Sequence, residues 1–298
     1  MKRLALFMLV NVAVLVVIAT VVQLLGLERY LQAYGVTIEG LLVLSAVFGF
    51  GGALISILLS KWLAVRSIGV RLIDAPQDPI ESRLLATVAN HAKRLNLGMP
   101  DVGIFDSPVM NAFATGPRRN HALIAVSSSL ANSMSPRELE AVLGHEMSHV
   151  ASGDMVTLGL LQGVLNTFVI FLARVMGSAI DGMIGGRREE SEPGGLFYFL
   201  IVVILEILFG VLATLVVMAF SRHREFSADA GGAKLAGSES MIAALRALEM
   251  SVAEPLPGQL RAFGIRGGTS RGGLRRLFMS HPPIEDRIAA LERSQRIY

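Results

Sequence analysis

Apolar residues gather in four long stretches along the chain, at residues 4–27, 41–60, 155–177 and 196–220. Each stretch is close to the length of about 20 residues that a helix needs to cross the hydrocarbon core of a bilayer. The composition fits this interpretation, because 52% of the residues are hydrophobic and only 17% are charged, whereas soluble domains carry about 25% charged residues. The pattern therefore predicts a mainly α membrane protein with four transmembrane helices.

The four stretches form two predicted transmembrane hairpins, at residues 1–60 and 154–220. Two polar regions, residues 61–153 and 221–298, follow the hairpins, and we expect them to be the two halves of one discontinuous α+β domain. Lysine and arginine are more frequent in the flanks beside the polar regions than at the other ends of the spans. The positive-inside rule then predicts that both termini and both polar regions face the cytoplasm.

The first polar region contains helix patterns and strand patterns. Residues 78–95 have apolar positions at helical spacing, and residues 102–105 and 122–126 have the composition of short strands. With a helix predicted at residues 136–152, we expect a small sheet that packs on this helix. Asn111 to Thr115 is a candidate edge strand, which could bind an extended substrate as an added strand or could equally be an ordinary structural strand.

The second polar region begins on a continuing helix. The fourth apolar stretch is followed by no helix breaker until Gly231-Gly232, where we expect its helix to end. Further helices are predicted at residues 238–250 and after Ser280-His281-Pro282-Pro283.

Local signals mark both ends of the helix predicted at residues 136–152. Ser135 and Glu138 have the spacing of a capping box, and Pro136 suits the first helical position. Gly153 follows the last periodic residue and is a typical helix stop. These signals therefore define the ends of the predicted helix clearly.

His145-Glu146-x-x-His149 is an H-E-x-x-H motif. Histidines four residues apart project from one face of a helix, so both imidazoles can reach one metal ion. Glu146 lies about 100° further round the helix, in an apolar sector where a carboxylate is costly unless it is paired or near a metal. Zn²⁺ lowers the pKa of water, and a carboxylate can take the proton. The motif predicts one zinc ion on His145 and His149 with Glu146 as the base; the alternative is two histidines on a solvated face.

Two histidines leave a catalytic zinc short of its usual three protein ligands. Glu225 and Asp229 are four residues apart on the helix that continues from the fourth apolar stretch, so they share a face. Glu225 could supply the third ligand, and Asp229 could hold His145 or His149 in the correct tautomer. His223 is a rival third ligand.

Several other polar residues have two possible roles. Asp154 could accept a hydrogen bond from a ligand histidine or could cap the next helix. His281 and Arg287 could stabilise an oxyanion near zinc, or could serve in helix capping and in an ion pair with Glu285 or Asp286.

Two charged residues interrupt the third and fourth apolar stretches. Arg174 lies near the far end of the third stretch, and we expect its side chain to extend towards the membrane interface. Glu206 lies in the middle of the fourth stretch. A polar contact between helices is the simpler interpretation of Glu206, and a proton or ion path is the functional alternative.

The chain contains no cysteine, which excludes cysteine metal ligands, a cysteine nucleophile and disulfides. The formal net charge of +3 is modest and gives no reason to expect nucleic-acid binding.

Taken together, these residues resemble the HtpX group of membrane zinc metalloproteases, which are related to the CAAX prenyl proteases. The matching segments are His145-Glu146-x-x-His149 with Asp154, Glu225-x-x-x-Asp229, Asn111-Ala112-Phe113-Ala114 and Ser280-His281-Pro282. The resemblance implies a gluzincin-like fold with His145, His149 and Glu225 on zinc and Glu146 as general base. It also implies a bacterial inner-membrane protein with a role in membrane protein quality control and the stress response.

We therefore predict a zinc-dependent membrane endopeptidase that cleaves misfolded or membrane proteins at the cytoplasmic face of the lipid bilayer. The first alternative is a non-enzymatic membrane scaffold with a structural zinc, whose four ligands would have to include His223 or His281. An intramembrane protease is a second alternative, but the helix at residues 136–152 carries Arg137, Glu138 and Glu140 and is not a span. A transporter that uses Glu206 is the third.

Overall fold

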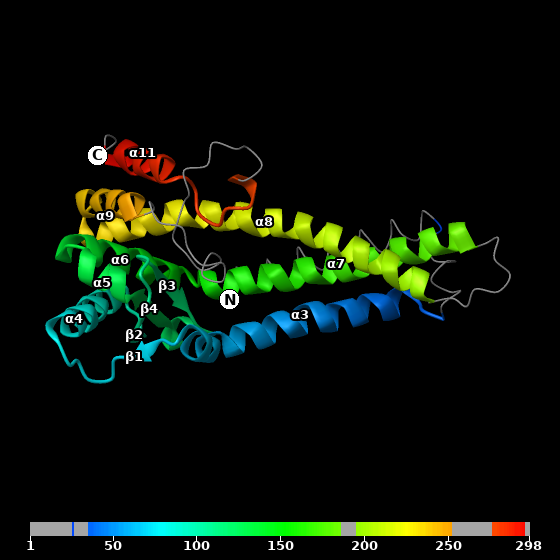
Figure 1. The fold of residues 1–298 in the computed structure, drawn as a ribbon, viewed down its shortest axis with the longest axis horizontal. Coiled ribbons are helices and arrows are strands. Elements are labelled where there is room, and N and C mark those ends of the chain that lie inside the picture. The colour runs from blue at the N-terminus through cyan, green and yellow to red at the C-terminus, as the bar shows by residue number, and fades with distance from the viewer. Residues whose placement is uncertain (1–25, 27–34, 186–194, 252–275, 296–298) are drawn as a thin grey trace. The chain divides into compact units, whose positions relative to one another are not determined.

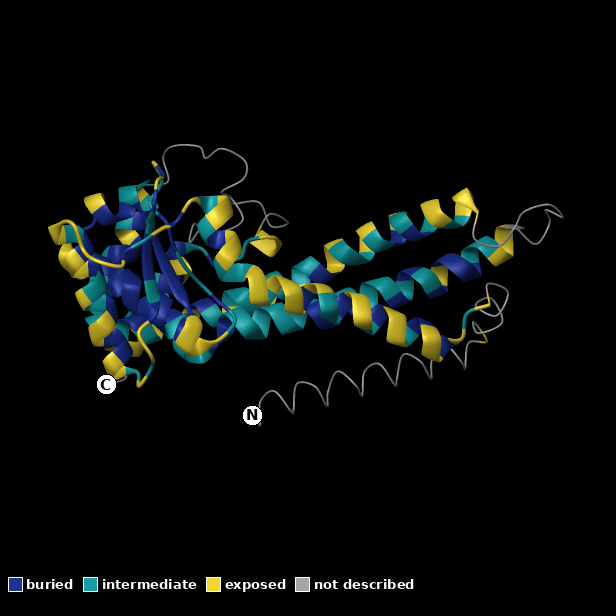
Figure 2. Cartoon of the chain, turned by 90° about the horizontal axis from the view of Figure 1, so that it is seen from below, coloured by how far each residue is buried: buried dark blue, intermediate teal, exposed yellow. Residues whose placement is uncertain are grey.

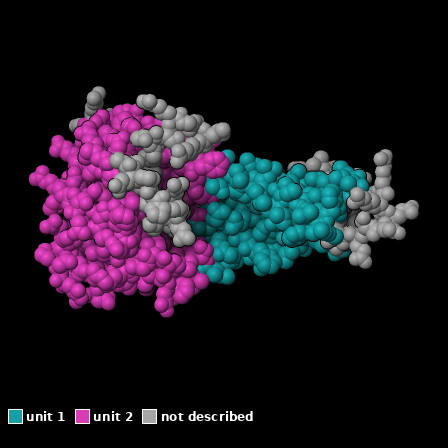
Figure 3. All heavy atoms as spheres, viewed as in Figure 1, with its two compact units in different colours: residues 1–55, 159–216 teal, residues 56–158, 217–298 magenta. Residues whose placement is uncertain are grey.

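The computed structural model describes residues 35–185, 195–251 and 276–295, together with Gly26. Contacts divide the chain into two compact units, shown in Figure 3. Unit 1 comprises residues 1–55 and 159–216, and unit 2 comprises residues 56–158 and 217–298. Apart from Gly26, the first predicted span at residues 4–27 lies outside the described residues.

Three long helices supply the described part of unit 1: α3 (Ile38–Leu63), α7 (Asp154–Gly185) and α8 (Leu196–Ala236), labelled in Figure 1. Within the described residues, these are the three helices that are long and apolar enough to cross a membrane. Their outward faces carry large exposed apolar side chains such as Phe48 and Ile204, as expected for helices whose solvent is lipid. The second, third and fourth predicted spans are therefore present as helices.

Close contacts join α3 to α7 inside unit 1. A Cβ atom added at Gly49 would lie 2.6 Å from the backbone nitrogen of Thr167, so only glycine permits this approach. Further along the same two helices, Ile38 and Leu41 form an apolar cluster with Phe171. Small residues at such crossings let the backbones of membrane helices come close together.

An ion pair joins α7 to α8 inside unit 1. Nη1 of Arg174 lies 2.7 Å from Oε1 of Glu206 and also donates to the carbonyl of Ile170. The expectation that Arg174 extends towards the interface is therefore wrong. A charge in an apolar segment is more stable beside an opposite charge, and Glu206 makes the polar contact between helices that its position indicated.

A four-stranded mixed sheet forms the centre of unit 2. Its strands are β1 (Arg71–Leu72), β2 (Asp101–Phe105), β3 (Ala112–Thr115) and β4 (Leu123–Ser127), in the order β1-β2-β4-β3. β2 and β4 are parallel, whereas β1 and β3 pair antiparallel with β2 and β4 respectively. β3 is thus an edge strand of the described sheet, at the place where the sequence predicted an edge.

Helices cover the sheet of unit 2. α6 (Pro136–Ser152) contacts β3 and β4 and packs against α4 (Pro79–Arg94) and α9 (Ser238–Met250), and α9 in turn packs against α11 (Ile284–Gln295). The shorter elements are α5 (Ser128–Ser133), the π-helix η1 (Ala64–Ile68) and the 3-10 helix η2 (Arg119–His121). Buried residues concentrate in the sheet and the helices beside it, which Figure 2 shows in dark blue.

α8 extends further into unit 2 than predicted, because it continues through Gly231 and Gly232 to Ala236. A Cβ atom at Gly232 would lie 3.0 Å from the backbone nitrogen of His145, and one at Gly144 would lie 3.3 Å from Cα of Gly232. The two glycines do not end the helix but allow α8 to cross α6 at backbone contact.

Candidate metal centre

The helix α6 is fixed at both ends by local interactions. The Ser135 hydroxyl accepts from the backbone N–H of Glu138, and the Glu138 carboxylate accepts from the N–H of Ser135, which completes the predicted capping box. Pro136 occupies the first turn, and Gly153 ends the helix with φ 71°. This helix holds His145 and His149 one turn apart in unit 2.

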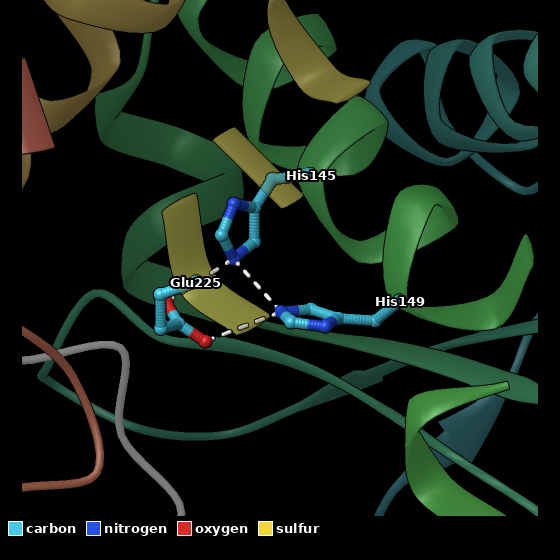
Figure 4. Close-up of side chains that lie close together, drawn as sticks. All are labelled: His145, His149 and Glu225. Atoms are coloured by element: carbon cyan, nitrogen blue, oxygen red, sulfur yellow. Dashed lines mark hydrogen bonds and ion pairs between the residues drawn. The ribbon is translucent and has the colours of Figure 1, made fainter. Parts of the chain in front are cut away.

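Three side chains from two helices converge beside α6, as Figure 4 shows. One ligand atom each from His145, His149 and Glu225 lie within 4.8 Å of one another. Nε2 of His149 is 3.2 Å from Nε2 of His145 and 3.2 Å from Oε1 of Glu225, while Nε2 of His145 is 3.6 Å from Oε2 of Glu225. The rival residue His223 is exposed and is not part of this group.

Two aspartates orient the two imidazole rings. The Nδ1–H of His145 donates to Oδ1 of Asp229 at 3.0 Å, and the Nδ1–H of His149 donates to Oδ2 of Asp154 at 2.8 Å. When the imidazoles are neutral, with the hydrogen on Nδ1, each Nε2 keeps its lone pair for another partner. Both lone pairs then face Glu225, as metal ligands would.

The carboxylates make the site strongly favourable for positive charge. Burial lowers the pKa of His149, but hydrogen bonds to Asp154 and Glu225 and the nearby charge of Glu146 outweigh it and raise the pKa to about 10. A buried imidazole holds its proton this firmly only where the surrounding potential is negative. Two imidazole nitrogens, which bind metal in their neutral form, and one carboxylate in this negative potential suit a divalent cation such as Zn²⁺.

The second oxygen of Glu225 lies close to nitrogen atoms of two other side chains. Nδ1 of His281 lies 2.7 Å and Nη1 of Arg287 lies 3.4 Å from Oε2 of Glu225. Within the described residues, however, this buried Oε2 accepts no well-aligned hydrogen bond. Oε2 of Glu225 therefore contacts His281 and Arg287 without a well-aligned hydrogen bond from either.

Arg287 lies behind the site and is fully buried. Its Nε and Nη2 donate to the two oxygens of Asp229 at 2.8 Å and 2.6 Å. This bidentate pair fixes the carboxylate that holds His145. The pairing with Glu285 or Asp286 that the sequence also allowed does not occur among the described contacts.

The remaining predicted site residues, Glu146 and Asn111, also lie in unit 2. Glu146 is 3% exposed and follows His145 on α6. Asn111 immediately precedes β3; its backbone N–H donates to the Ser127 hydroxyl at 2.9 Å, and the side chain is buried.

Two arginines at the site carry no motif that singles them out. Nη2 of Arg224 lies 2.6 Å from Oδ1 of Asp154. Nη1 of Arg222 donates to the carbonyls of Leu277 and Met279 at 2.9 Å, just before His281. In the sequence, both arginines were only part of the basic flank of a span.

Comparison with known proteins gives the family. The family described as Peptidase family M48 matches residues 80–295, which is most of the chain. The chain belongs to peptidase family M48.

This M48 chain is 53% identical to Protease HtpX of Stenotrophomonas maltophilia (strain R551-3), over 98% of each chain. It is 50% identical to the Protease HtpX homolog of Thiobacillus denitrificans (strain ATCC 25259 / T1), over 99% of this chain and 100% of that one. The crystal structure of S. mikatae Ste24p has a similar fold, with a TM-score of 0.61 and 17% identity, over 98% of this chain and 67% of that chain. The M48 chain is a membrane metalloprotease, as the resemblance implied.

Proposed function

We propose that this M48 peptidase is a zinc endopeptidase in which His145, His149 and Glu225 hold one Zn²⁺ per chain and Glu146 is the general base. The observation that carries the proposal is the convergence of the three ligand atoms within 4.8 Å. The ligand set and its two supporting aspartates are those of a gluzincin-like site.

When bound, zinc supplies a Lewis acid that polarises the scissile carbonyl and lowers the pKa of water. Glu146 takes the proton from the attacking water and passes it to the leaving amine. Asp229 and Asp154 keep both imidazoles in the tautomer that directs Nε2 inwards.

The substrate would add to the sheet as a strand. β3 is an edge strand whose neighbour β4 lies on one side, and α6 contacts β3. An extended peptide on this edge would run beside the helix that carries Glu146. Asn111, which precedes β3, is our candidate for a substrate contact.

His281 is the better candidate for stabilising an oxyanion. Its Nδ1 lies 2.7 Å from Glu225, and its side chain is partly exposed. Arg287 is fully buried and engaged by Asp229, so we assign it to positioning. Oxyanion stabilisation requires a donor that substrate can reach.

We also propose the cellular setting. Residues 61–153 and 221–298 would form one discontinuous catalytic domain, whose two halves follow the membrane hairpins at residues 1–60 and 154–220 respectively. The described contacts of the site all join residues of unit 2. With four spans in a bacterial inner membrane and the domain in the cytoplasm, the substrates would be misfolded or membrane proteins, and the role would be quality control.

The test is a comparison of Glu146→Gln with the wild-type protein in detergent. Zinc content, measured by atomic emission, should stay near one ion per chain, because Glu146 is not in the ligand set. Cleavage of an unfolded substrate such as casein should fall by about 10²-fold to 10⁴-fold, the usual contribution of a positioned base.

Glu140→Gln is the matched control, since Glu140 is on the same helix α6 outside the ligand group, and it should cleave normally. Retained proteolysis in Glu146→Gln would disprove the role of Glu146. A structural zinc would need a fourth protein ligand, and the described cluster contains three.

A further inference from the structure

Each histidine of the site is the first member of a chain of three residues. His145 donates to Asp229, and Asp229 accepts two hydrogen bonds from Arg287. His149 donates to Asp154, whose other oxygen Oδ1 lies 2.6 Å from Nη2 of Arg224. The site therefore contains two Arg–Asp–His chains that converge at Nε2.

We infer that Arg224 is a positioning residue for zinc binding, which acts through Asp154 on His149. The inference rests on the proposed function, because it takes His149 to be a zinc ligand. Arg224 precedes Glu225 on α8, whereas Asp154 begins α7 directly after α6. One ion pair thus connects the helix that carries Glu225 to the end of the helix that carries His149.

Burial explains why Asp154 needs this partner. Its side chain is only 5% exposed, and a buried carboxylate is costly unless it is paired. The guanidinium of Arg224 supplies the opposite charge at Oδ1 and holds the carboxylate in place, so that Oδ2 can accept from His149. A carboxylate partner on Nδ1 also makes His149 a stronger ligand.

The two Arg–Asp–His chains differ in the burial of the arginine and in its contact with the aspartate. Arg287 is fully buried and bidentate, whereas the Arg224 side chain is 23% exposed and contacts Asp154 through one nitrogen. Arg224 can therefore be removed with less damage to packing, and this makes it the more informative of the two to change.

The experiment measures zinc affinity of the full-length protein in detergent. The protein is stripped of metal and titrated with Zn²⁺ against a competing chelator. Arg224→Met should weaken affinity by about 10-fold to 100-fold, as is usual when an outer partner of a ligand is lost. Asp154→Asn should weaken the zinc affinity by a similar factor. Because Arg224 acts only through Asp154, the double variant should bind zinc no more weakly than the single variant with the lower affinity.

Arg246→Met is the matched control, because Arg246 is exposed on α9 and lies 3.9 Å from Glu292; it should bind zinc normally. Raising free zinc should restore cleavage in Arg224→Met, which a general structural defect would not allow. Arg224→Lys keeps the charge and should recover part of the affinity. Circular dichroism of the metal-free proteins reports whether each variant folds, and if Arg224→Met does not, Arg224→Gln replaces it.

Unchanged affinity in the folded Met or Gln variant would overturn the inference. So would losses that multiply in the double variant, or a Lys variant no better than Met. His149→Ala separates this result from the proposed function: if it binds zinc like wild type, the ligand set is wrong. If it loses zinc while the neutral Arg224 variants keep it, only the role of Arg224 fails.

Discussion

At the scale of single residues, His149 links protonation to metal binding. Hydrogen bonds to Asp154 and Glu225 overcome the effect of burial and raise its pKa from 6.5 to about 10. The protonated form is therefore favoured in the metal-free fold. Its contribution to the free energy of unfolding is complete below pH 6.5 and is lost as the pH rises towards 10.

Zinc has to displace this proton, so the affinity for Zn²⁺ should keep rising with pH well above 6.5. We expect an increase of about tenfold per pH unit between about pH 7 and about pH 9, measured by chelator competition. Asp154→Asn removes one of the groups that raise the pKa of His149. In this variant the zinc affinity should therefore stop rising with pH at a lower pH than in the wild type. A wild-type affinity that is already constant at about pH 7 would contradict this.

At the scale of secondary-structure elements, the crossing of α6 and α8 determines how Glu225 and Asp229 reach the histidines. A Cβ atom at Gly231 would lie 2.7 Å from Cβ of Ser148 and would also meet its hydroxyl. Gly231→Ala should therefore push the helices apart. We expect a loss of about 1–3 kcal/mol of stability, the usual effect of overpacking, together with weaker zinc binding.

Gly210 provides the matched control on the same helix, because a Cβ atom there meets nothing within 4 Å. Gly210→Ala should be neutral or slightly stabilising in a thermal melt, since alanine favours helix over glycine. Equal melting temperatures for Gly231→Ala and Gly210→Ala would show that the crossing of α6 and α8 accommodates a Cβ atom at residue 231, and would contradict this prediction.

The same elements show what the sequence can predict. α6 begins and ends where Ser135, Glu138 and Gly153 predict, because its caps are interactions between residues close in sequence. The role of Gly231-Gly232 was mistaken, since glycine is a common helix stop and only the packing of α6 reveals another reason for it. Likewise Arg224 reaches Asp154 across many residues, and no local pattern indicates which arginine of a basic flank will do so.

At the scale of the whole molecule, α8 contributes to both compact units. Within unit 1 it carries Glu206, which pairs with Arg174 of α7 at 2.7 Å. An unpaired charge near the centre of a span costs roughly 2.5–3.5 kcal/mol. The Arg174–Glu206 pair has two interpretations, which make different predictions. In the first, the pair only joins α7 to α8; in the second, the Glu206 carboxylate serves an ion path.

For a pair that joins the helices, Glu206→Leu should lower the thermal stability in detergent, because Arg174 loses its partner. The double variant Arg174→Leu, Glu206→Leu removes both charges, so no unpaired charge remains in the apolar segment. It should recover most of the stability and keep zinc-dependent cleavage of casein. A double variant that folds normally but no longer cleaves would instead require a functional charge at Glu206 or Arg174. Since both substitutions lie in unit 1 and the ligand group lies in unit 2, unchanged cleavage is the outcome that we expect.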